Sequence, residues 1–189
     1  MSFFWQAILV EGGLAVIAII ADVFLRLNFQ TYFQYNNETL IQIVWGLLPL
    51  IAGYFVLLAL PFAGVRQIDR IVRELFGQYM RHWKLWQIAV VAALAGLGEE
   101  LFFRGLIQMG FSSIFDVWLA ILLTSLIFGL AHAITPTYCF LAFIISLYLS
   151  FLFIHTGSLL VPIAIHALYD FFVFLFIRFT PHRHKAMLD

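Results

Sequence analysis

The sequence consists mainly of long apolar runs separated by short polar segments. Of its 189 residues, 64% are hydrophobic and 11% are charged, and the mean hydropathy is +1.02. Soluble domains are close to half apolar and a quarter charged. Because a helix needs roughly 20 apolar residues to cross a bilayer, about six such helices use up most of the chain. We therefore expect an all-α, polytopic integral membrane protein with about six transmembrane helices.

Hydropathy places six candidate spans along the chain. They cover Phe3–Leu25, Leu40–Phe62, Leu85–Met109, Phe115–Ile134, Tyr138–Ile154 and Ser158–Phe179. The fifth span is short, and tight turns at 135–137 and 155–157 join it to its neighbours. We expect the last four helices to pack as successive antiparallel hairpins and to form a compact core.

The basic residues gather in two regions. They are Arg66, Arg70, Arg73, Arg81 and Lys84 between the second and third spans, and Arg178, Arg183 and Lys185 near the C-terminus. The positive-inside rule places both regions in the cytoplasm, and six spans put the N-terminus there too. The segment Val65–Arg81 has apolar residues at helical spacing, which predicts an amphipathic helix on the cytoplasmic membrane surface. The net charge of zero argues against a nucleic-acid partner. The location that we expect for this membrane protein is the bacterial inner membrane.

Several ionisable residues lie inside the apolar spans. They are Glu99, Glu100 and Arg104 in the third span, His132 in the fourth, and His166 and Asp170 in the sixth. A charged group at the bilayer centre costs about 2.5 to 3.5 kcal/mol on insertion scales, so such residues usually face a polar cavity. Together they predict one buried polar site. In the first span, Glu11 and Asp22 lack obvious partners, and we expect Glu11 to line a cavity or to lie near the interface.

The spacing of these residues suggests separate roles. Glu100 and Arg104 are four residues apart, which suits an ion pair, and Glu99 is turned about 100° away. One carboxylate could be neutralised by the arginine while the other acts as a general base. A purely structural ion-pair cluster is equally compatible with this spacing.

The fourth and sixth spans carry two further pairs with a spacing of four. Phe128 and His132 lie on one helix face, and Gly129 between them permits close approach of a neighbouring helix. On the sixth span, the carboxylate of Asp170 could orient the imidazole of His166 or share a proton with it. Each pair could also be an ordinary hydrogen-bonded packing feature, but three such signals on three neighbouring helices favour a common site.

The order of these motifs resembles a known family. Glu99-Glu100-x-x-x-Arg104, then Phe128-x-x-x-His132, then His166-x-x-x-Asp170 resemble the successive motifs of the CPBP (CAAX protease and bacteriocin-processing, Abi) intramembrane proteases. The resemblance covers roughly residues 94–172. It implies a glutamic-type intramembrane endopeptidase whose active site is buried between the last four helices.

The resemblance also implies roles for individual residues. Glu99 with His132 would activate the attacking water, and His166 with Asp170 would stabilise the oxyanion, although Asn is common in relatives at the position of Asp170. Glu100, Arg104 and Phe128 would support the site structurally. We expect the chain to divide into 1–84, with two transmembrane helices and the amphipathic loop, 85–180, a catalytic core of the CPBP type, and 181–189, a cytoplasmic tail. The implied partners are the lipid bilayer and a membrane-embedded or lipidated peptide or protein substrate.

The same residues are also compatible with a zinc protease, a transporter and a membrane scaffold. No cofactor is expected, because no H-E-x-x-H helix is present. The alternative is a zinc-dependent protease in which Glu99, His132, His166 and Asp170 bind the metal. Buried ionisable residues on several helices also occur in proton-coupled transporters. In a non-catalytic membrane scaffold, the same cluster would only fix the helix register.

Overall fold

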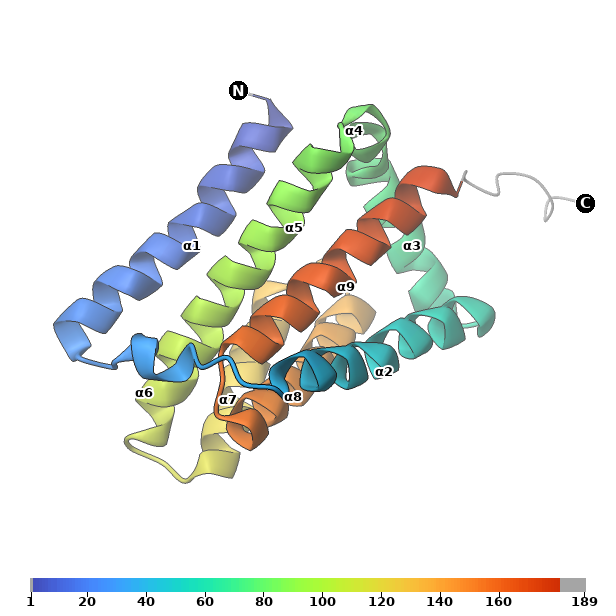
Figure 1. The fold of residues 1–189 in the computed structure, drawn as a ribbon. Helices are drawn as coiled ribbons and strands as arrows, with labels where there is room; N and C mark the ends of the chain where they lie inside the picture. The colour runs from blue at the N-terminus through green and yellow to red at the C-terminus, as the bar shows by residue number, and fades with distance from the viewer. Residues whose placement is uncertain (1, 181–189) are drawn as a thin grey trace, which may run out of the picture.

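The computed structural model describes residues 2–180, which contain helices and no strand (Figure 1). The α-helices are α1 (Phe3–Leu25), α2 (Thr39–Ala59), α3 (Ala63–Leu75), α4 (Gly77–His82), α5 (Leu85–Glu100), α6 (Met109–Ser112), α7 (Val117–Ala131), α8 (Pro136–Thr156) and α9 (Leu160–Phe179). A short 3₁₀-helix η1 (Phe29–Tyr32) follows α1, and a π-helix η2 (Leu101–Gln108) joins α5 to α6. The all-α prediction is confirmed, and the predicted tail 181–189 lies outside the described residues.

Four of the described helices, α1, α2, α8 and α9, are long and apolar enough to cross a membrane. The fifth predicted span was expected to be short, but α8 has 21 residues. The fourth was expected to be longer than α7, which has 15 residues because Asp116 caps its start and the chain turns at His132. The third predicted span corresponds to α5, η2 and α6, where the helical hydrogen-bonding pattern changes after Glu100. The structure is therefore that of a polytopic membrane protein.

The helices do not all pack as successive hairpins. Helix α5 runs beside α1 and α9 (Figure 1), and both contacts are extensive. Helix α7 packs along α8 as predicted, and Gly129 makes this possible, because a Cβ there would lie 2.9 Å from the carbonyl oxygen of Cys139. Sequential order therefore predicted the α7–α8 pair, whereas the main partners of α5 are distant in sequence.

The start of α1, helix α4 and the end of α9 lie at the same end of the molecule (Figure 1). The ring of Phe3 stacks on Tyr79 with centroids 4.5 Å apart. The guanidinium of Arg178 donates hydrogen bonds to the carbonyl oxygens of Met80 and Trp83. The three segments that the charge pattern assigns to one side of the membrane are thus neighbours in space.

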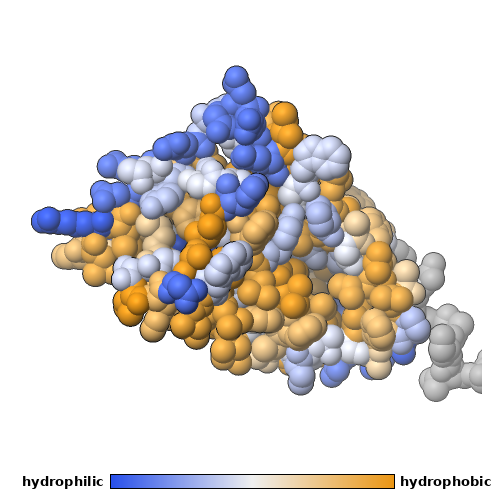
Figure 2. Space-filling model, turned by 90° about the horizontal axis from the view of Figure 1, so that it is seen from below, coloured by the Kyte–Doolittle hydropathy of each residue, from blue (hydrophilic) through white to orange (hydrophobic). Residues whose placement is uncertain are grey.

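The surface is largely apolar. Phe24 on α1 and Trp45 on α2 are among many large apolar side chains that are exposed. Figure 2 shows broad hydrophobic areas on one face, with hydrophilic residues mostly toward its margins. Lipid rather than water is the solvent that suits such a surface.

The predicted amphipathic segment forms α3 and α4, with a break at Phe76. Within α3, Arg73 Nε donates to both carboxylate oxygens of Asp69, at 2.8 and 2.9 Å. Arg73 also donates to the carbonyl oxygen of Thr180 at 2.7 Å. These contacts join α3 to the end of α9.

Candidate active site

The acidic pair lies at the junction between α5 and the π-helix η2. Glu99 and Glu100 are the last two residues of α5, and the wider π-helical turns begin at Leu101. Single π-turns inside α-helices occur often at functional sites. Glu100 and Arg104 are completely buried, and Glu99 is 9% exposed.

A polar seam runs along η2 and faces α8. The Arg104 guanidinium donates to Glu100 Oε1 at 3.0 Å, which confirms the expected contact between these side chains. Arg104 also donates to the carbonyl and hydroxyl oxygens of Ser146 on α8, both at 3.0 Å. One turn further along, Gln108 donates to the carbonyl oxygen of Ser150 at 3.5 Å. The hydrogen bonds to Glu100 and Ser146 satisfy most of the donors of the buried Arg104 guanidinium. They are needed because burying a charge without partners costs a large amount of free energy.

His132 follows directly after α7 and is held by Phe128. Its Nδ1 lies 2.8 Å from the carbonyl oxygen of Phe128, and the two rings stack with centroids 4.3 Å apart. Because a carbonyl oxygen only accepts, Nδ1 must carry a proton. Nε2 therefore points to Glu99, whose Oε2 is 3.6 Å away. Phe128 also lies beneath the Arg104 guanidinium, 5.1 Å from the ring centroid.

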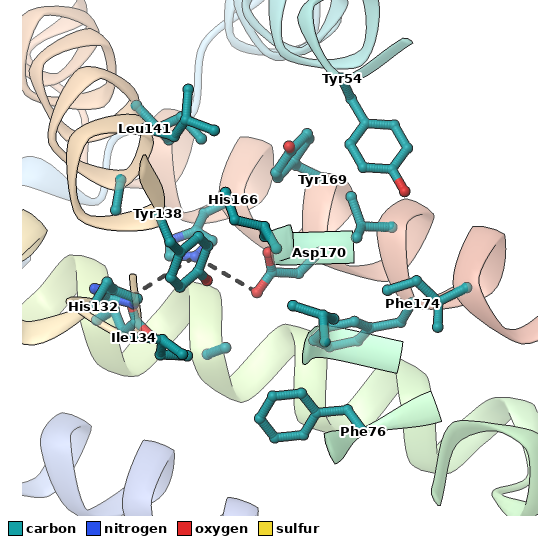
Figure 3. A pocket seen from close by; sticks show the side chains of 18 of the residues that line it. Tyr54, Phe76, His132, Ile134, Tyr138, Leu141, His166, Tyr169, Asp170 and Phe174 are labelled. Carbon is teal, nitrogen blue, oxygen red and sulfur yellow. Dashed lines mark ion pairs between the residues drawn. The ribbon is translucent and has the colours of Figure 1, made fainter. Parts of the chain in front are cut away.

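His166 on α9 connects the two carboxylates. Its Nδ1 lies 2.8 Å from Glu100 Oε1, which is also the acceptor for Arg104. Its Nε2 lies 3.6 Å from Asp170 Oδ2 and 4.0 Å from Glu99 Oε2. Figure 3 shows His132, His166 and Asp170 gathered at one end of a pocket. The structure thus brings together all four residues that the sequence analysis proposed as catalytic.

These residues face a cavity of about 440 Å³. Its walls are mostly apolar, and Figure 3 shows Tyr54, Phe76 and Phe174 away from the histidines. Residues of α1, α2 and α3 line it together with residues of α5, α8 and α9. The candidate catalytic residues lie in the predicted core, 85–180. The cavity that they face is also lined by α1, α2 and α3, which lie outside that core.

Two contacts of the site were missed by the sequence analysis. Ser146 gave no signal, because one serine in an apolar helix is common and its partner Arg104 lies 42 residues away. The contact between Glu100 and His166 was also missed, because the spacing within each helix suggested separate pairs. Glu11 does line the cavity, one of the two positions expected for it. Asp22 does not, and its Oδ1 accepts a hydrogen bond from the backbone N–H of Phe29.

The predicted alternative to a metal-free site was a zinc site. Among residues 2–180, no three His, Cys, Asp or Glu side chains are arranged as ligands of one metal ion. The four residues named as alternative zinc ligands are close together, but they do not form such an arrangement in this conformation.

The fold and site define a class of protein: a polytopic helical membrane protein with a buried carboxylate–histidine centre at the end of an apolar cavity. Residues 81–172 match the family model described as Rce1-like, type II CAAX prenyl endopeptidase Rce1-like. The match includes all three motifs and confirms their resemblance to the CPBP/CAAX protease family. No curated protein and no solved structure matched the chain.

Proposed function

We propose that this protein is an intramembrane endopeptidase that hydrolyses a peptide bond in a membrane-embedded or lipidated peptide or protein. The observation that carries the proposal is the position of Glu99. Its Oε2 atom is buried without a hydrogen-bond partner and lies between the imidazoles of His132 and His166. The family match to a prenyl endopeptidase supports the same reaction class.

Glu99 and His132 would act together on the attacking water. The distance of 3.6 Å between Glu99 Oε2 and His132 Nε2 is too long for a direct hydrogen bond, but one water can bond to both atoms. With Nδ1 of His132 donating to Phe128, Nε2 is free to accept from this water. Glu99 then accepts the proton as water attacks the carbonyl carbon, and the proton passes to the leaving amine.

His166 would stabilise the oxyanion that forms in this step. Because Nδ1–H donates to Glu100, Nε2 can donate toward the cavity only when the ring is an imidazolium. Glu100 and Asp170, on opposite edges of the ring, both favour that charged form. Asp170 would therefore act by orienting and charging His166, a role that does not require a proton on the carboxylate.

The test is cleavage of a panel of tagged membrane peptides by the purified protein in detergent. Glu99→Gln and His132→Ala should each lower the rate by about 10² to 10⁴-fold, the usual contribution of a positioned acid or base. Glu38→Gln removes an exposed carboxylate just before the start of α2 and is the matched control. Cleavage unaffected by Glu99→Gln and His132→Ala would contradict this assignment of the site.

The zinc alternative is tested in the same assay. A strong chelator should leave the wild-type rate unchanged if Glu99 and His132 alone activate the water. Loss of cleavage on chelation, with recovery on addition of zinc, would instead support a metalloprotease that uses the same four side chains. Replacement of the general base would then act through metal affinity, which metal analysis of the Glu99→Gln variant would reveal.

A further inference from the structure

The charge of the cavity is strongly one-sided. Four carboxylates line it, those of Glu11, Asp69, Glu99 and Asp170, whereas among the described residues no Lys or Arg does. Asp69 is neutralised by Arg73, whose Nε donates to both of its carboxylate oxygens. The other three carboxylates share the cavity with only two imidazoles, so acidic groups outnumber the groups in its lining that can carry a positive charge.

Glu11 is the carboxylate that the proposed reaction does not use. It lies on α1, outside the matched region 81–172, and belongs to a stripe with Phe3 and Ala7 that faces the cavity at a spacing of four. Its Oε2 is buried and has no hydrogen-bond partner. A buried, unpartnered carboxylate oxygen is costly for the free protein, and a ligand that donates to it would remove that cost.

The position of Glu11 is fixed by close packing against the catalytic helix. A Cβ at Gly98 would lie 2.2 Å from the backbone carbonyl oxygen of Glu11, so the two backbones approach at the residue just before Glu99. The packing of α1 against α5 therefore fixes the backbone of Glu11 next to Gly98, one residue before Glu99.

We propose that Glu11 selects substrates that carry a basic side chain close to the cleaved bond. This inference rests on the proposed endopeptidase function and names a substrate class for it. The carboxylates are not arranged to chelate a metal ion. They are spread along a mostly apolar cavity, which suits a Lys or Arg side chain whose stem packs on apolar walls while its head donates several hydrogen bonds.

The same charge disfavours another kind of substrate. A free C-terminal carboxylate placed beside the cleaved bond would lie among three carboxylates, with no Lys or Arg in the described lining and only the two imidazoles to offset them. Like charges at short range in a poorly solvated site repel strongly. The cleaved bond should therefore be followed by enough residues to keep the C-terminus away from this end of the cavity.

Binding can test this inference without catalysis. The probes are fluorescently labelled apolar peptides that are identical except for one residue, which is Lys, the uncharged norleucine, or Glu, moved one position at a time along the peptide. Anisotropy in detergent measures their Kd for the wild type, for Glu11→Gln and for the surface control Glu38→Gln. Glu11→Gln keeps the shape of the side chain and removes its charge. For each protein, the ratio of the Kd for the norleucine peptide to the Kd for the Lys peptide is insensitive to a general loss of folded protein.

At the best register, the wild type should bind the Lys peptide about tenfold or more tightly than the norleucine peptide, as expected for a hydrogen bond to a charged group. The Glu peptide should bind most weakly. Glu11→Gln should reduce the Lys preference severalfold, and Glu38→Gln should keep it. The inference is overturned by equal ratios in the wild type and Glu11→Gln, or by a wild type that prefers no charge or binds no peptide.

Cleavage measured on the same peptides separates the two proposals. If binding depends on Glu11 but no peptide is cleaved, the basic-residue subsite stands and the endopeptidase function fails. If peptides are cleaved with equal kcat/KM whether the variable residue is Lys or norleucine, the endopeptidase function stands and the selective role of Glu11 fails.

Discussion

Replacement of Arg104 by Met should strongly destabilise the protein. Arg104 is completely buried, and its guanidinium donates to Glu100 and to both oxygens of Ser146. Met fills a similar volume but leaves Glu100 with a buried charge whose remaining partner is His166. Breaking a buried ion pair by removing one partner costs about 3 to 5 kcal/mol. The folding equilibrium should therefore shift by a factor of at least about 100.

The assay is reversible unfolding in mixed micelles of dodecyl maltoside with increasing dodecyl sulfate, followed by tryptophan fluorescence. The double variant Glu100→Gln/Arg104→Met is the informative comparison. It removes both charges, so it should be more stable than Arg104→Met alone although it carries one substitution more. An Arg104→Met variant within about 0.5 kcal/mol of the wild type, the range of ordinary surface substitutions, would refute the reasoning.

Three further predictions follow from the contacts. Gly98→Ala should destabilise the protein by about 1 to 3 kcal/mol through its clash with α1, whereas Gly12→Ala, which meets no atom within 4 Å, should be neutral or slightly stabilising in the same unfolding assay. Asp170→Ala should lower the cleavage rate by about 10²-fold or more. Asp170→Asn should lower it by less, because Asn can still orient His166 and donate to the oxyanion. Equal rates for the wild type and both variants would contradict the role of Asp170 in supporting His166. Arg70 on α3 is exposed. In an Arg70→Cys variant, the thiol should react with an impermeant reagent only from the cytoplasmic side. Reaction from the other side would invert the proposed topology.

Hydropathy and motif spacing predicted much of the architecture, because both are local properties of a helix in lipid. The first span, Phe3–Leu25, has the predicted bounds. Contacts at a spacing of four were predicted for Glu100 with Arg104 and for His166 with Asp170, and both are found. In each of these cases the geometry is set within one helix.

Features that depend on packing between distant helices could not be predicted in this way. The ends of α7 are set by the side chain of Asp116 and the turn at His132, which apolar content does not report. The sixth span was predicted to begin at Ser158, yet the hydroxyl of Ser158 donates to the carbonyl oxygen of Gln34, and α9 begins at Leu160. The place of Glu11 beside Glu99 follows from the close approach of α1 to Gly98, which the sequence does not encode as a pattern.

We propose that Glu99 and His132 activate one water together, and a double-mutant cycle on the cleavage rate can measure whether they do. Two residues that act as a unit lose their function when either is removed, so the double variant Glu99→Gln/His132→Ala should be no slower than the slower single variant. We expect that result, with the cleavage rate of each single variant reduced by about 10²-fold or more. Effects that multiply in the double variant would mean that the two side chains act independently, and would contradict it.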